Sequence, residues 1–173
     1  HRNEFAKPPA RPAKWNHVNP GFDNFEVFGN TFKIQREIPA LSLITHANTN
    51  KIKLLSRTFI PDGPIVLEES IAVSTAGSYA PGEAYILRSF NLSTHAFEED
   101  NLIAADKEGK LAFSLSGGGH WLGINREAEP EAQLGIIFPN NQEHFYFEEG
   151  ETESLNFSLI NLGNASAKEI EII

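Results

Sequence analysis

The chain has 173 residues, of which 40% are hydrophobic and 21% charged, so its composition is that of a folded globular protein rather than a disordered one. Its formal net charge of -9 disfavours nucleic acid and anionic membranes as partners, and the absence of cysteine excludes disulfides, thiolate metal sites and cysteine nucleophiles. No apolar run approaches the roughly 20 residues that a bilayer-spanning helix needs, so we expect no membrane insertion.

The first 24 residues carry Pro8, Pro9, Pro12 and Pro20 among charges of both signs. Such a composition favours extended, polyproline-like backbone over helix. We therefore expect residues 1–24 to form a linker, or a strap that runs along a surface.

From Phe25 onward the chain consists of short segments rich in β-branched and aromatic residues, such as TFKIQ, EAYILRSFNL and KLAFSLS. Turn signals such as PDGP, APGE and KEG separate them, and apolar and polar residues alternate, for example over residues 71–74. No window of helical length keeps a 3.6-residue apolar period. The sequence therefore predicts an all-β fold, with an antiparallel immunoglobulin- or fibronectin-like β-sandwich over residues 25–126.

A charged, proline-bearing segment, NREAEPEAQ, interrupts this pattern at residues 125–133, and strand-like segments resume after it. Residues 127–173 are therefore expected to supply additional strands. Two arrangements are open for them: they complete the first sheet, or they are the first strands of a second β-sandwich.

Gly117, Gly118 and Gly119 stand directly before His120 and Trp121. A phosphate-binding loop needs Lys and Ser or Thr after its glycines, a dinucleotide site needs a different glycine spacing, and the esterase oxyanion motif places histidine before its glycines. None of these patterns is present. We expect the glycines to supply positive φ angles in a hairpin turn.

The sequence offers no catalytic group of a known pattern. It contains neither a Gly-x-Ser-x-Gly elbow nor His-Glu-x-x-His, and its six histidines are scattered. Its paired acids are typical of solvated turns. We therefore predict no catalytic residue, no metal ligand and no cofactor for this chain.

Four residues are candidates for ligand contacts: Trp15, Tyr79, His120 and Trp121. An exposed aromatic ring can stack on the face of a sugar, so these positions support the alternative that the chain is a carbohydrate-binding module for polysaccharide. In an all-β domain, however, a tryptophan is more often packed than displayed.

His1 suggests a third hypothesis. A free N-terminal histidine can chelate copper through its amine and its ring, as in the copper-dependent polysaccharide oxidases. Because a translated chain begins with methionine, we favour the simpler interpretation that His1 marks a processing boundary or a cut from a longer chain.

Several motifs carry a family resemblance over roughly residues 12–125. They are Trp15-x-His17 before the strand-like FEVFG, the Pro61-Asp62-Gly63 and Pro81-Gly82 turns, and the segment Asp106-x-x-Gly109-x-Leu111 that leads to the glycines. In these features the chain resembles the β-sandwich region that follows the catalytic domain in certain bacterial esterases of the α/β-hydrolase fold.

The resemblance implies that the serine, acid and histidine of the esterase lie upstream and are not in this chain. It implies a non-catalytic accessory domain of a secreted or periplasmic bacterial hydrolase. Its partner would be its own catalytic domain or an oligomer partner.

Overall fold

A computed structural model describes residues 17–18, 21–59, 63–141, 150, 152 and 154–168. The predicted all-β, antiparallel fold is confirmed, whereas the finer immunoglobulin- or fibronectin-like assignment stays a prediction. Over these ranges the only helical element is the 3₁₀ turn η1 (Pro139–Asn141), so no helix there is long and apolar enough to cross a membrane.

The largest sheet has seven antiparallel strands. Its order is β1 (His17–Val18), β4 (Leu41–Thr45), β5 (Lys51–Arg57), β11 (Gly119–Arg126), β7 (Ala84–Asn91) and β8 (Ala96–Phe97), and β9 (Asn101–Ala104) also pairs with β7. The predicted strap therefore includes two residues, His17 and Val18, that pair with β4 at the edge of this sheet.

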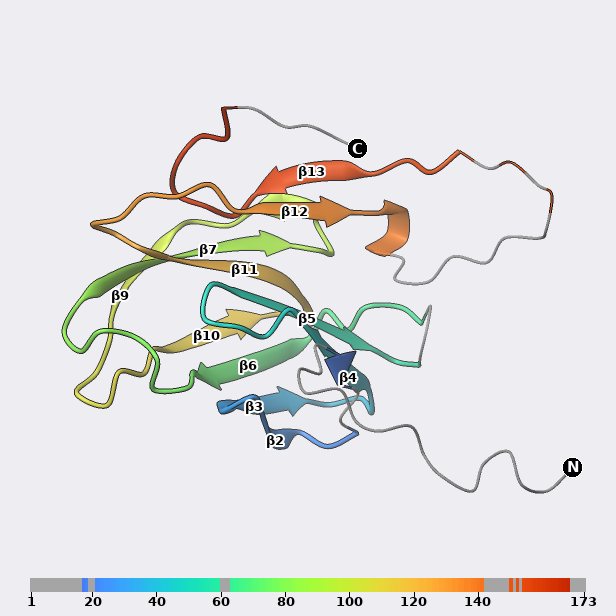
Figure 1. The fold of residues 1–173 in the computed structure, drawn as a ribbon. Coiled ribbons are helices and arrows are strands. Elements are labelled where there is room, and N and C mark those ends of the chain that lie inside the picture. The colour runs from blue at the N-terminus through green and yellow to red at the C-terminus, as the bar shows by residue number, and fades with distance from the viewer. Residues whose placement is uncertain are drawn as a thin grey trace, which may run out of the picture.

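A four-stranded sheet packs on one face of the large sheet. Its order is β10 (Ala112–Ser116), β6 (Glu69–Ser74), β3 (Asn30–Arg36) and β2 (Asn24–Val27). Figure 1 shows these four strands on the lower side of the molecule, with β11 and β7 above them.

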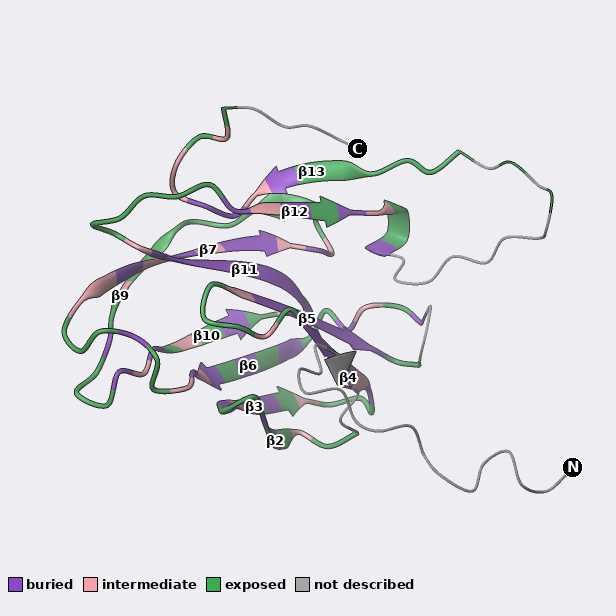
Figure 2. Cartoon of the chain, viewed as in Figure 1, coloured by how far each residue is buried: buried purple, intermediate pink, exposed green. Residues whose placement is uncertain are grey.

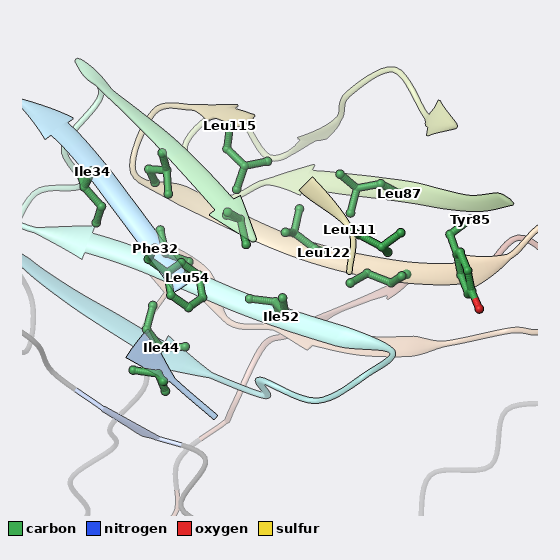
Figure 3. Close-up of a cluster of buried hydrophobic side chains, with 14 of the residues drawn as sticks. Phe32, Ile34, Ile44, Ile52, Leu54, Tyr85, Leu87, Leu111, Leu115 and Leu122 are labelled. Carbon is green, nitrogen blue, oxygen red and sulfur yellow. The ribbon is translucent and has the colours of Figure 1, made fainter. Parts of the chain in front are cut away.

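The core between the two sheets consists of apolar side chains from alternate strand positions. In β6 the burial pattern alternates along the strand, with Ile71 and Val73 inward, as the sequence predicts for a strand with one buried face. Figure 3 shows Phe32 next to Leu54 of the large sheet, and Ile34 and Leu122 belong to the same buried cluster.

The last described strands, β12 (Leu134–Ile137) and β13 (Ser158–Asn161), form a separate antiparallel pair. Figure 1 shows them above β7 and β11, on the face opposite to the four-stranded sheet. They share a second core with the large sheet, made of Leu43, Leu55, Phe90, Leu92, Trp121, Ile137, Ile160 and Leu162.

Within residues 127–173, the described strands β12 and β13 are hydrogen-bonded to each other and pack on the large sheet from outside. Whether residues 127–173 complete the first sheet or begin a second sandwich stays a prediction.

The glycine-rich segment also differs from the expected hairpin turn. It joins β10 in the four-stranded sheet to β11 in the large sheet, so it crosses between the two layers. Only Gly117 has a positive φ, of 89°. Gly118 is required by close packing instead, since a Cβ atom there would lie 2.6 Å from the Val66 carbonyl oxygen and 2.8 Å from the Ser56 Cβ.

Candidate functional site

Three of the four predicted ligand-contact residues are interior residues. Tyr79 is 8% exposed, Trp121 4% and His120 0%, whereas Trp15 lies outside the described residues. Tyr79 and Trp121 therefore do not present a ring face on which a polysaccharide could stack. Trp121 is buried because β12 and β13 cover its face of the large sheet, whereas Tyr79, in the connection between β6 and β7, is held by its contacts with Thr49 and Tyr85.

Tyr79 has a structural role. Its hydroxyl donates a 2.9 Å hydrogen bond to the Thr49 carbonyl oxygen, and its ring meets Tyr85 edge-on with the ring centroids 5.0 Å apart. Burial and the neighbouring Tyr85 raise the pKa of Tyr79 far above its usual range, so the phenol stays neutral.

The His120 ring lies among a serine and an acid. Its Nδ1 is 3.1 Å from the Ser89 Oγ and 3.5 Å from the Glu98 Oε2, while its Nε2 lies 3.1 Å and 3.0 Å from the carbonyl oxygens of Ser116 and Gly117. Strands β7 and β11 supply Ser89 and His120, and Glu98 follows directly after β8. The sequence did not predict this Ser–His–Glu group, because its members come from separate strands.

The geometry of this group differs from that of a catalytic triad. A triad uses one ring nitrogen for the nucleophile and the other for the acid, whereas here Ser89 and Glu98 both face Nδ1. Carbonyl oxygens only accept, so Nε2 must carry a proton and donate it to Ser116 and Gly117. Ser89 is 2% exposed, so no substrate reaches its hydroxyl.

The protonation state of His120 determines how the group is connected. The Ser89 hydroxyl has one proton, so it donates either to Nδ1 of a neutral ring or to Glu98, and in the second case it accepts a hydrogen bond from a protonated Nδ1. Burial would raise the pKa of Glu98, but hydrogen bonds from Ser89 and Asn91 and the nearby His120 outweigh it and lower that pKa.

A second candidate site lies on the opposite face of the large sheet, where Trp121 lines a groove beside β12. The groove has a volume of about 340 Å³, and its described lining is His46, Lys51, Lys53, Trp121, Leu134, Gly135, Ile136 and Phe138. We call it the Trp121 groove. The indole packs so closely on Gly135 that a Cβ atom there would lie 2.8 Å from its Cη2 atom.

The Trp121 groove combines cations with an apolar wall. Trp121 pairs directly with Lys53 across β11 and β5, and the Lys53 Nζ lies 4.8 Å from the indole centroid. The His46 ring packs against the same indole with centroids 5.6 Å apart, and the Lys51 Nζ donates to the Leu134 carbonyl oxygen over 2.8 Å.

Trp121 was a predicted contact residue, whereas the lysines beside it were not predicted. The signal was present in Lys51-Ile52-Lys53-Leu54, because alternate residues of a strand share a face. This places Lys51 and Lys53 together on one side and the buried Ile52 and Leu54 on the other.

No group of three or more histidine or acidic side chains that could hold a metal ion occurs within the described ranges. His1, on which the copper hypothesis rests, lies outside those ranges. Comparison with known proteins found no matching family model, no matching curated protein and no matching solved structure.

Proposed function

We propose that this chain is a non-catalytic accessory β-sandwich domain of a larger exported bacterial hydrolase of the esterase type, acting through contacts with the catalytic domain of its own polypeptide. The observation that carries the non-catalytic part is the enclosure of the Ser89–His120–Glu98 group. Its serine is buried and both ring nitrogens of its histidine are engaged within the fold.

The contact surface in this proposal is the outer face of β12 and β13. The Ile136 and Leu159 side chains lie opposite each other in the register of this pair, and they are 46% and 37% exposed. Leu155 and Phe157, just before β13, are exposed as well, and Figure 2 shows this stretch of the chain in green. Neighbouring exposed apolar residues of this kind are typical of protein contact surfaces.

An esterase assay tests the non-catalytic part. We expect hydrolysis of p-nitrophenyl acetate by the isolated chain to equal the buffer background, and Ser89→Ala to leave it unchanged, because Ser89 is closed to substrate. Turnover above the background that disappears in Ser89→Ala would contradict the proposal.

The contact is tested in the full-length parent protein. We expect Ile136→Lys with Leu159→Lys to lower the unfolding temperature of the catalytic domain, because the lysines would place charge in an apolar interface. Leu102→Lys is the matched control, since Leu102 is 61% exposed and lies on β9. A parent without a hydrolase domain, or equal effects of both variants, would refute it.

A further inference from the structure

Strand β10 forms one edge of the four-stranded sheet. It pairs with β6 on one side, and among the described strands none pairs with its other side. Natural proteins usually protect such an edge with charged side chains, proline or a bulge, because its unpaired backbone groups are a template for another strand. The sequence of β10, AFSLS, has no charge and no proline, and its register with β6 runs without a bulge.

The register with β6 fixes which backbone groups of β10 point outward. The Thr75 amide donates to the Leu111 carbonyl oxygen over 2.9 Å, and the Gly117 amide donates to the Glu69 carbonyl oxygen over 2.8 Å. Because hydrogen-bonded and non-hydrogen-bonded positions alternate in an antiparallel pair, every second residue from Leu111 to Gly117 bonds to β6. The residues between them direct their N–H and C=O groups away from β6; they are Ala112, Ser114 and Ser116.

The side chains at these three outward positions are small and uncharged. Ala112, Ser114 and Ser116 are all exposed, so no long side chain shields the backbone groups beside them. No charged residue occurs from 111 to 119, in a chain whose net charge is -9. Strand β2, at the other edge of the same sheet, carries the exposed carboxylate of Glu26. At the β10 edge, by contrast, an incoming strand meets no charge.

A second copy of β10 fits this edge. The outward residues are spaced evenly about Ser114, so an antiparallel pairing with Ser114 on a twofold axis sets Ser114 opposite Ser114 and Ala112 opposite Ser116. Every outward N–H group then meets an outward C=O group of the other copy, since the two residues of such a pair exchange both hydrogen bonds. The same patch serves both copies, as twofold symmetry requires.

The charges at the two ends of the strand agree with this pairing. The Lys110 side chain, just before β10, is 42% exposed, and in the twofold arrangement Lys110 lies opposite Gly118 of the other copy. The Gly118 amide donates to the Val66 carbonyl oxygen, so the exposed Glu68 lies at that end of the sheet. Each end of the pairing therefore brings a lysine of one copy toward a glutamate of the other.

From these observations we propose that β10 pairs with β10 of a second copy, so that two four-stranded sheets join into one continuous sheet. The interface is a strand edge rather than a broad face, which places the dimer among weak, transient associations. The proposal goes beyond the accessory-domain proposal and does not depend on it, because β10 lies on the opposite side of the large sheet from β12 and β13 (Figure 1).

Disulfide capture tests the pairing and its register. The chain contains no cysteine, so Ser114→Cys introduces a single thiol. Across a hydrogen-bonded antiparallel pair the Cα atoms are about 5.5 Å apart, which a disulfide can bridge. We expect mild oxidation to convert most of this variant to a covalent dimer. The matched control, Glu26→Cys, places a thiol on the exposed edge strand β2 and should stay largely monomeric.

Sedimentation equilibrium tests the association without a cross-link. We expect the wild type to approach twice the chain mass at millimolar concentration. Ser114→Lys should weaken this association about tenfold, because two like charges would lie directly opposite each other. Ala72→Lys is the matched control, since Ala72 is exposed and pairs with Ser114, but its strand β6 is not an edge. If Ser114→Lys does not fold, Ser114→Cys carries the test.

Three results would overturn the proposal. They are a wild type that stays monomeric at millimolar concentration, equal dimer yields from Ser114→Cys and Glu26→Cys, and equal association of the folded Ser114→Lys and Ala72→Lys variants. None of these results bears on the esterase assay or on the contact made by β12 and β13, so failure here is distinguishable from failure of the proposed function.

Discussion

His120 is the most enclosed polar side chain that the sequence singled out. All of its ring is buried, and the ring contacts the β10–β11 connection through Nε2 and the β7–β8 region through Nδ1. His120 therefore links the β10–β11 connection, which crosses between the two sheets, to the β7–β8 edge of the large sheet. We assign it a structural role on this ground.

His120→Ala should destabilise the fold by about 2–4 kcal/mol, because it leaves a cavity and deprives Ser89 and two carbonyl groups of their partner. Denaturant unfolding followed by tryptophan fluorescence measures this. His95→Asn is the control: His95 is exposed and has a positive φ of 54° that asparagine tolerates, so its cost should stay within about 0.5 kcal/mol. Equal costs would contradict the structural role.

Glu98 gives the same group a dependence on pH. Because its pKa in the folded state lies below the ordinary value of 4.5, the carboxylate stabilises the fold above that value and the contribution disappears as pH falls through the folded-state pKa. Its side chain is 38% exposed, so the stabilisation should stay below about 1 kcal/mol.

Unfolding free energies of wild type and Glu98→Gln, measured from pH 7 down to pH 3, test this. The wild type should be the more stable protein at pH 7, and the difference should shrink as the pH falls below 4.5. If the stability difference between the wild type and Glu98→Gln grew as the pH was lowered, it would contradict a lowered pKa of Glu98 in the folded state.

At the scale of elements, the buried Arg36 forms ion pairs between neighbouring strands of the four-stranded sheet. Arg36 at the end of β3 contacts Asp23 at 2.5 Å, and its Nη1 lies 3.6 Å from the Glu69 Oε2 at the start of β6. Ser42 of β4 and Ser56 of β5 approach from the large sheet, with their hydroxyl oxygens 3.3 Å apart. Neither Glu69 oxygen has a hydrogen bond of normal length.

Burial raises the pKa of Glu69, and the nearby Ser56 and Arg36 offset this only in part. The contribution of Glu69 to stability is therefore fully present below the ordinary value of 4.5 and is lost as pH rises through the higher folded-state pKa. Glu69→Gln keeps the shape and cannot ionise.

We expect the stability of Glu69→Gln relative to the wild type to increase as pH rises above 4.5, in thermal unfolding experiments across this window. Glu68→Gln is the control, because Glu68 is the adjacent residue and its side chain is exposed. A pH-independent difference for Glu69→Gln would show that the carboxyl group is not strained by burial.

The buried side chains could be predicted from the sequence in strands that have one buried face and one exposed face. Ile71 and Val73 alternate with polar residues in β6, and the structure buries them as expected. Strand β11 has no such alternation, and Figure 2 shows it buried along its length. Because β12 and β13 cover its second face, both sets of its side chains are interior, which a local pattern cannot reveal.

At the scale of the whole molecule, the described strands form three layers, and the third layer buries the outer face of the large sheet. Leu43, Leu55, Phe90 and Trp121 of the large sheet point away from the main core and are buried by Ile137, Ile160 and Leu162. A two-stranded pair is only marginally stable by itself, so β12 and β13 depend on this contact in return.

Removing residues 127–173 should therefore expose an apolar face of the sandwich. We expect the shortened chain to unfold at a lower temperature and to bind the dye ANS, whereas the full chain unfolds in one cooperative transition. Differential scanning calorimetry and dye fluorescence provide the measurements. A shortened chain as stable as the full one would mean that the third layer is an independent module.

The all-β fold class could be predicted from the sequence alone, because the patterns that indicate strands and turns are local. The alternation of apolar and polar residues over 71–74 indicates a strand, and turn glycines indicate where strands end, each within a few residues. Only the tertiary structure decided the surroundings of Trp121, Lys53 and His120. The local sequence pattern predicts that these residues lie on strands, but it does not show which face of the sheet a later segment of the chain covers. Burial and the meeting of Ser89, His120 and Glu98 depend on contacts between strands that are distant in the chain.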